Sequence, residues 1–113
     1  MSKLDEKIEL YASALKDKAG VSADMDLLRA VTRGLGPSIY NKDAETVSCT
    51  DASELDRVKA NYLIKKLGLA DSAALDAAIK EVCEQMGSSN RNKYRGAFYY
   101  LLAVKFKKQS VYA

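Results

Sequence analysis

Histidine is absent from this 113-residue chain. Its absence removes the commonest general base near neutral pH and the commonest transition-metal ligand. A Ser-His-Asp triad or a histidine-containing zinc site therefore cannot be built from these residues. We expect no catalytic residue, no metal site and no cofactor, and we expect that the protein is not an enzyme.

Glycine, proline and long apolar runs are also scarce. The chain has six Gly, one Pro and no Trp, so it contains little loop-forming material. Alanine, leucine, lysine and acidic residues dominate, which favours helix over strand. No apolar stretch approaches the ~20 residues that span a bilayer, so we expect no membrane association. With 48% hydrophobic residues, residues 1–113 are long enough to form a single all-α domain with its own core.

Cysteine occurs only at positions 49 and 83. Two distant cysteines indicate neither a disulfide framework nor a metal knuckle, so we predict a reducing, cytoplasmic setting. The polar residues Met1–Lys7 do not resemble a signal peptide. Cys49 precedes a predicted helix, where the dipole favours a reactive thiolate, but without a histidine partner we favour a small buried spacer. Cys83 lies on an apolar helix face and is predicted to be core.

Acidic residues are missing after Glu84. Residues 85–113 hold six of the 18 basic residues and none of the 15 acidic ones, so their net charge is +6 and that of residues 1–84 is −3. Such asymmetry points to an acidic partner or nucleic acid. The same segment contains the apolar run Ala97–Val104, which instead predicts a buried helix.

Helical spacing of apolar residues predicts about five helices in a compact bundle. The expected helices cover about 4–20, 23–34, 51–68, 72–87 and 91–108, with a short turn over 37–40. The second helix is expected to bury Met25, Leu28, Val31 and Leu35. A capping box formed by Asp51 and Glu54 is expected at the start of the third helix. Because the last helix is apolar nearly all round, we expect it at the centre of the bundle.

The segment Ser88–Arg95 is the predicted site. Unpaired N–H groups at a helix start attract anions, and cations there are unfavourable unless an anion is present. We therefore predict anion binding by Ser88, Ser89, Asn90, Arg91, Lys93 and Arg95. Two interpretations stay open: the anion is an external phosphate or carboxylate, or it is one of the chain's own carboxylates.

Among functions, we favour a small interaction or adaptor module that binds an unknown protein partner or itself. Seven tyrosines fit this interpretation, because tyrosine is enriched at interfaces. The alternative is weak, sequence-independent binding of nucleic-acid phosphates by the basic C-terminal segment. A recognition helix is not expected, because the Ala97–Val104 run is too apolar to lie in a major groove.

Five strings in the chain are similar to those of a bacterial domain-of-unknown-function family of short helical proteins. They are Leu35–Asn41, Val47–Cys49, Lys65–Leu69, Ser89–Arg95 and Phe98–Leu102. The resemblance implies an all-helical fold and a bacterial, cytoplasmic origin. It implies no activity, substrate or cofactor for any residue.

Overall fold

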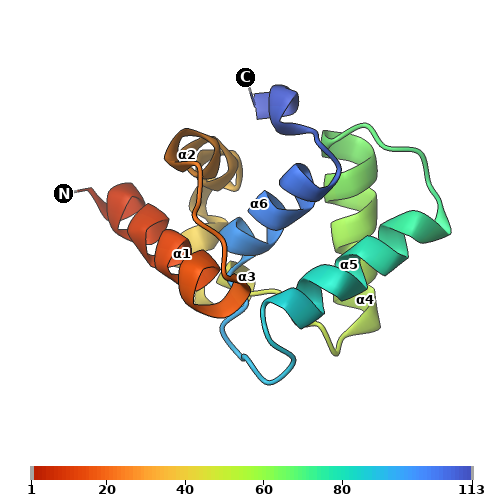
Figure 1. The fold of residues 1–113 in the computed structure, drawn as a ribbon, viewed down its shortest axis with the longest axis horizontal. Helices are drawn as coiled ribbons and strands as arrows, with labels where there is room; N and C mark the ends of the chain where they lie inside the picture. The colour runs from red at the N-terminus through yellow and green to blue at the C-terminus, as the bar shows by residue number, and fades with distance from the viewer. Residues whose placement is uncertain (1, 113) are drawn as a thin grey trace.

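The apolar spacing correctly predicts the longer helices in the computed structural model, which describes residues 2–112. In order these are α1 (Lys3–Ala19), α2 (Met25–Gly34), α4 (Ala52–Arg57) continuing into the π-helix η2 (Val58–Lys66), α5 (Ala73–Gln85) and α6 (Arg95–Lys105) (Figure 1). Shorter turns are η1 (Gly36–Tyr40), α3 (Lys42–Glu45) and η3 (Gln109–Tyr112). No strand forms within residues 2–112, so the predicted all-α class is confirmed.

Capping residues set the bounds of α1 as predicted. The Ser2 hydroxyl accepts a hydrogen bond from the Asp5 amide at 3.1 Å, and this satisfies one of the free N–H groups of the first turn. Gly20 ends the helix with a φ of 68°, a left-handed conformation that suits glycine. Between these caps, Ile8, Tyr11 and Leu15 face the core.

The burial prediction for α2 is confirmed at Leu28 and Val31, is wrong at Met25, and overstates the burial of Leu35, which is only partly buried. Asp24 caps the helix by accepting from two backbone amides, and Leu27, Leu28 and Val31 are buried. Met25 was expected in the core but is 46% exposed, because Leu27 makes the core contact at this end of the helix.

The third predicted helix begins at its cap, Asp51, but changes its winding at Val58. Its buried residues recur at 58, 62–63 and 67, every four to five positions, which suits the wider π-helix better than the α-helix. The Glu54 side chain binds Arg57 and Arg95, so the predicted capping box is incomplete.

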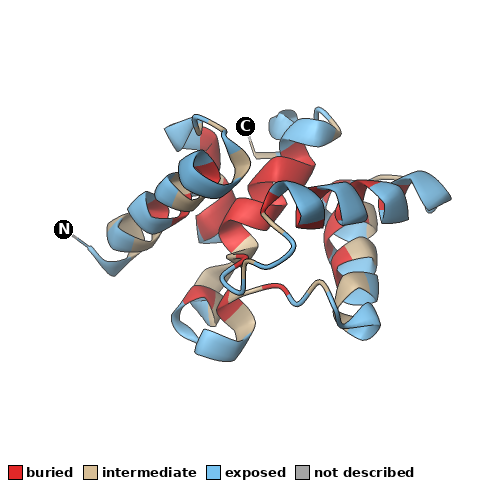
Figure 2. Cartoon of the chain, turned by 60° about the horizontal axis from the view of Figure 1, so that its bottom comes forward, coloured by how far each residue is buried: buried red, intermediate tan, exposed pale blue. Residues whose placement is uncertain are grey.

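The helix α6 lies at the centre of the bundle, as predicted. It passes between α1 and α2 on one side and α5 on the other (Figure 1). Every residue from Gly96 to Ala103 is buried, and Figure 2 shows α6 as the most continuous buried element. It ends at Lys105, earlier than expected, because Lys107 takes a left-handed φ of 55° and turns the chain into η3.

The short helix η3 folds back over α2 and η2. The Tyr112 hydroxyl donates to the Tyr62 hydroxyl at 2.9 Å, and Tyr62 donates to the Tyr99 carbonyl oxygen at 3.0 Å. The Tyr62 and Tyr99 rings stack with centroids 3.9 Å apart. Tyr62 and Tyr99 are therefore core residues, and the partly buried Tyr112 packs against them.

Within residues 2–112, no helix is both long enough and apolar enough to cross a membrane.

Candidate functional site

The predicted site segment is a loop and not the start of a helix. α6 begins at Arg95, so residues 88–93 precede it. Asn90 shapes this loop through its side chain. Its side-chain nitrogen Nδ2 donates to the Met86 carbonyl oxygen at 3.0 Å, and its side-chain oxygen Oδ1 accepts from the Asn92 backbone amide at 3.0 Å. The expectation that the helix starts right after Asn90 is therefore wrong, because the Asn90 side chain holds the backbone in a turn.

A second segment lies against this loop. Thr46 and Tyr94 form an isolated antiparallel bridge, and the Val47 amide donates to the Lys93 carbonyl at 2.8 Å. The two segments enclose a pocket of about 470 Å³. We call it the loop pocket, and its lining residues are Val47, Cys49, Thr50, Ser88, Ser89, Asn90, Arg91 and Lys93.

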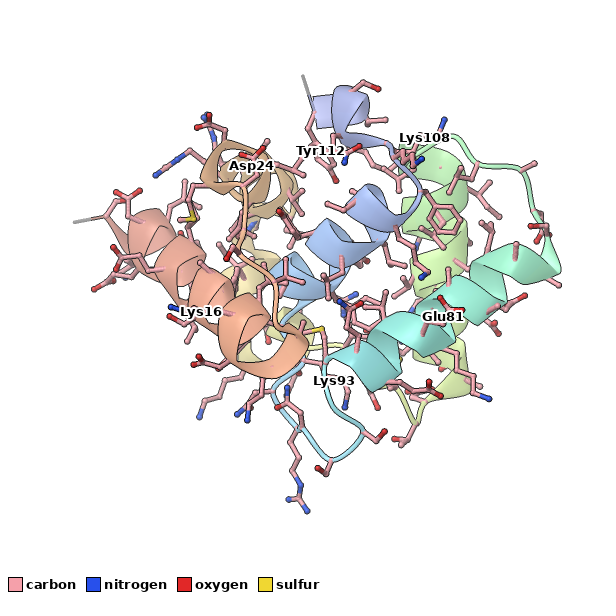
Figure 3. The ribbon with its side chains drawn as sticks, viewed as in Figure 1. Lys16, Asp24, Glu81, Lys93, Lys108 and Tyr112 are labelled. Atoms are coloured by element: carbon pink, nitrogen blue, oxygen red, sulfur yellow. A yellow bond between two sulfur atoms is a disulfide. The ribbon has the colours of Figure 1, made fainter. Side chains whose placement is uncertain are left out.

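Five of the six predicted site residues meet in the loop pocket. Lys93 is the most unusual, because it is only 6% exposed (labelled in Figure 3). Its ammonium donates to the Asn90 carbonyl at 2.6 Å. None of the ion pairs within residues 2–112 includes Lys93. Lysine is rarely buried without a paired charge, so this cation lacks its usual partner.

The buried acid Glu45 and the partly buried acid Glu54 already have cation partners. The Glu45 carboxylate accepts from the Lys7 ammonium and from the Tyr11 hydroxyl, both at 2.7 Å. Glu54 is bound to Arg95 and Arg57. Neither carboxylate neutralises the cation in the loop pocket.

Polar groups on the pocket rim are free to meet a ligand. Arg91 is exposed and takes part in no ion pair within the described residues. Ser88 and Ser89 are also exposed. Hydroxyl and guanidinium donors beside a buried ammonium form a surface suited to an oxyanion.

Arg95 lies outside the loop pocket and follows the second of the two open interpretations, in which a predicted site cation binds the chain's own carboxylate. Its guanidinium donates to the carbonyl oxygens of Ala44 at 2.8 Å and Thr46 at 3.3 Å, and it forms an ion pair with Glu54. Burial alone would lower the pKa of Arg95, but hydrogen bonds to Tyr99 and Glu54 raise it above the ordinary value. For this residue the anion is the chain's own carboxylate.

Cys49 and Cys83 form a disulfide, with Cα atoms 6.1 Å apart. The prediction of two unpaired cysteines is therefore wrong, and so is the alternative of a reactive Cys49 thiol. The bridge at Thr46 and Tyr94 brings residues 46–51 beside the end of α5, which places Cys49 near Cys83. Sequence spacing alone could not show this contact, because the residues are 34 positions apart.

Val47 and Thr50 are pocket residues that sequence reasoning missed as site residues. Neither carries a charge, and Val47 belongs only to one of the strings that carry the family resemblance; the bridge beside Lys93 places them at the pocket. Among residues 2–112, no group of three or more Cys, Asp or Glu side chains is arranged to hold a metal ion.

A family described as "Protein of unknown function (DUF2853)" matches residues 10–110. No curated protein matches the chain.

Proposed function

The chain belongs to the DUF2853 family, and from its geometry we propose that it is a small non-enzymatic binding module that holds an anionic group of a partner protein in the loop pocket. The group would be a phosphate or a carboxylate, since both accept several hydrogen bonds from cations and hydroxyls.

The buried cation of Lys93 is the observation that carries this proposal. Removing an ammonium from water costs several kcal/mol unless a partner charge compensates. Lys93 has one carbonyl partner and no carboxylate among the described residues. An anion in the loop pocket would supply the missing charge, and Arg91 would add a second cation at the rim.

Binding rather than catalysis fits the available side chains. The chain has no histidine, and both cysteines are held in the disulfide, so neither offers a thiolate nucleophile. A pocket lined by hydroxyls and cations suits recognition of a charged group without a reaction.

Nucleic-acid binding by the basic C-terminal segment is a second proposal with less support. It would use phosphate contacts from Lys107 and Lys108, which follow α6. However, α6 itself is buried, Lys105 is paired with Glu81, and Arg95 is paired inside the fold. Few cations of this segment therefore remain for a nucleic-acid backbone.

We propose a cytoplasmic location, in which the Cys49–Cys83 disulfide forms and breaks reversibly. Stable disulfides persist in oxidising compartments, whereas cytoplasmic ones are usually transient. Trapping of free thiols in intact cells would test this: Cys49 and Cys83 found permanently bonded would exclude the cytoplasm.

Titration of the oxidised protein with inorganic phosphate, followed by nitrogen-15 NMR, tests the binding proposal. We expect saturable shifts at residues 47–50 and 88–93. Lys93→Met should weaken binding by about tenfold or more, because a charge-assisted hydrogen bond contributes ~1.5–3 kcal/mol. A phosphoserine peptide should shift the same amides and bind more tightly than phosphate alone.

The matched control is Lys65→Met, which removes an exposed lysine from η2. It should bind phosphate like the wild type. Equal binding by Lys93→Met and wild type, or shifts spread over all lysines, would overturn the proposal. A DNA duplex that shifts residues 105–108 at low salt, with no phosphate response in the loop pocket, would favour nucleic acid instead.

A further inference from the structure

We infer that the Cys49–Cys83 disulfide is a redox gate that controls anion binding in the loop pocket. This inference rests on the proposed function of that pocket. It concerns how the site is regulated and not whether it binds.

The disulfide connects one wall of the loop pocket to α5, the helix that leads into the other wall. Cys49 lies in one wall, between Val47 and Thr50. Cys83 lies near the end of α5, five residues before Ser88, where the opposite wall begins. The bond therefore fixes residues 47–50 relative to the loop that carries Lys93.

Other interactions hold the first wall at its two ends. Val47 is attached through its amide to the Lys93 carbonyl and its side chain is buried in the core, and Asp51 begins α4. Between them, the Ser48 and Thr50 hydroxyls contact each other at 3.4 Å. Within residues 2–112, no hydrogen bond joins residues 48–50 to α5 or to residues 88–93. The disulfide is the covalent tie at the middle of this segment.

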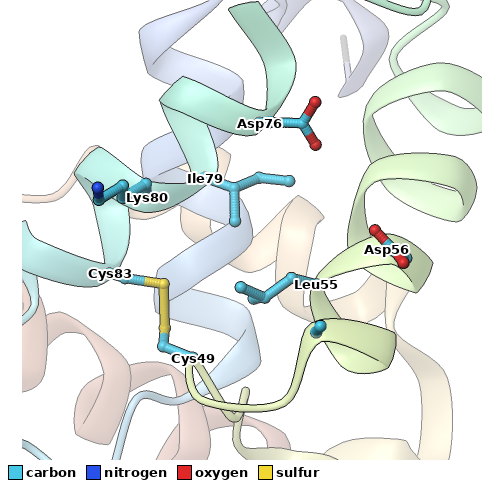
Figure 4. Close-up of a pocket in the computed structure, with 8 residues that line it drawn as sticks. Cys49, Leu55, Asp56, Asp76, Ile79, Lys80 and Cys83 are labelled. Atoms are coloured by element: carbon cyan, nitrogen blue, oxygen red, sulfur yellow. A yellow bond between two sulfur atoms is a disulfide. The ribbon is translucent and has the colours of Figure 1, made fainter. Parts of the chain in front are cut away.

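The bond is open to small reductants. Besides the loop pocket, Cys49 lines a hollow of about 370 Å³ between α4 and α5, and Figure 4 shows the disulfide at the edge of that hollow. Cys49 is partly exposed, whereas Cys83 is 8% exposed. A thiolate can therefore reach the Cys49 sulfur, and the Cys83 sulfur is the leaving group.

The reductant is a dithiol. Its first thiolate attacks Cys49 Sγ, which forms a mixed disulfide and releases the Cys83 thiolate. The second thiolate of the dithiol then attacks the sulfur atom that the dithiol contributed to the mixed disulfide, and the Cys49 thiolate is released. The dithiol becomes a cyclic disulfide, two electrons pass to the protein, and the cysteines take up two protons when both become thiols.

Reduction should weaken anion binding by releasing the first wall. Apparent Kd rises in inverse proportion to the fraction of molecules that keep the binding-competent arrangement. If about one third of reduced molecules keep it, Kd rises about threefold.

The test compares phosphate binding before and after reduction with dithiothreitol, by nitrogen-15 NMR. Reduced protein should show a Kd about threefold higher or more, while the amides of α6 keep their shifts. The Cys49→Ser/Cys83→Ser double variant should bind like reduced protein, and dithiothreitol should not change it.

The outcomes separate the two proposals. If oxidised protein does not bind phosphate in the loop pocket, the proposed function fails and the gate fails with it. If oxidised and reduced proteins bind equally, the gate is wrong and the binding site stands. If reduction unfolds α6, the disulfide is a structural staple and the gate is also wrong.

Discussion

Gly96 of α6 lies against the ring of Tyr11 of α1, so that a Cβ atom at position 96 would be 2.6 Å from Tyr11 Cδ2. The ring has no space to move away. Tyr11 is fully buried, and its hydroxyl donates to Glu45 at 2.7 Å. Glycine at this position is therefore a packing requirement between the two helices.

Gly96→Ala should destabilise the protein although alanine favours helix. The gain in helix propensity is about 1 kcal/mol, and overpacking of a rigid core costs about 1–3 kcal/mol. We expect a net loss of about 1 kcal/mol, within a range of about 0–2 kcal/mol, in the free energy of unfolding, measured by urea denaturation. Gly34→Ala is the control, because its Cβ would lie 3.7 Å from Tyr112 Cε1, an ordinary contact. Equal stability of the two variants would contradict the packing argument.

Lys93→Met should raise stability while it reduces phosphate binding. The substitution removes a buried charge that has no carboxylate partner among the described residues, and it loses one charge-assisted hydrogen bond to Asn90 worth about 1.5–3 kcal/mol. Since desolvation of a charge costs more than that, we expect a net gain of about 1 kcal/mol. Thermal unfolding without phosphate measures it. A lower melting temperature would show that Lys93 is a structural residue rather than a binding residue.

Glu54→Gln should destabilise the fold and leave phosphate binding unchanged. It would leave Arg95 without its counter-charge, at 16% side-chain exposure. Loss of one partner of such a pair costs about 2–4 kcal/mol, measured by urea denaturation. Asp5→Asn breaks the more exposed pair with Arg29 and should have a much smaller effect. Loss of phosphate binding in folded Glu54→Gln would place Arg95 back in the site.

Alkaline pH should unfold the protein through its buried tyrosines. Burial, and then the hydrogen bond to Glu45, raise the pKa of Tyr11 above its ordinary 10.0. Burial, and then the hydrogen bond with Tyr112, raise the pKa of Tyr62. The unfolded chain loses these protons at lower pH than the folded protein does, so the free energy of unfolding falls as pH rises above about 10.

Tyrosinate absorbance and circular dichroism, recorded together from about pH 9 to 12, check this expectation. Part of the absorbance change should coincide with loss of helix. Tyr40→Phe removes a phenol that is 50% exposed and should leave that transition where it is. Complete ionisation of all tyrosines before any helix is lost would refute it.

Local signals made the helices predictable. Ser2, Gly20 and Asp51 act at the ends of helices as their chemistry requires, and the apolar run from Ala97 identified the central element. The misplaced start of α6 has a local and a non-local cause: the Asn90 side chain holds a turn, and the bridge between Thr46 and Tyr94 extends the preceding loop.

The site was predictable in composition but not in geometry. Ser88 to Lys93 were selected from their charge and polarity, and five of the six predicted residues do line one pocket. The sequence could not show that Arg95 turns toward Glu54, or that Cys49 meets Cys83, because both pairings depend on how distant segments pack.

The position of α6 bears on how the polypeptide acquires its structure during synthesis. The helix that fills the middle leaves the ribosome after α1, α2, α4 and α5, all of which precede it in the chain. Until it emerges, contacts such as that between α1 and α2 can form, but the faces of α1, α2 and α5 that pack on α6 stay uncovered. Completion of the core therefore waits for nearly the whole chain, and chains stopped before residue 95 should be targets for chaperones and proteases.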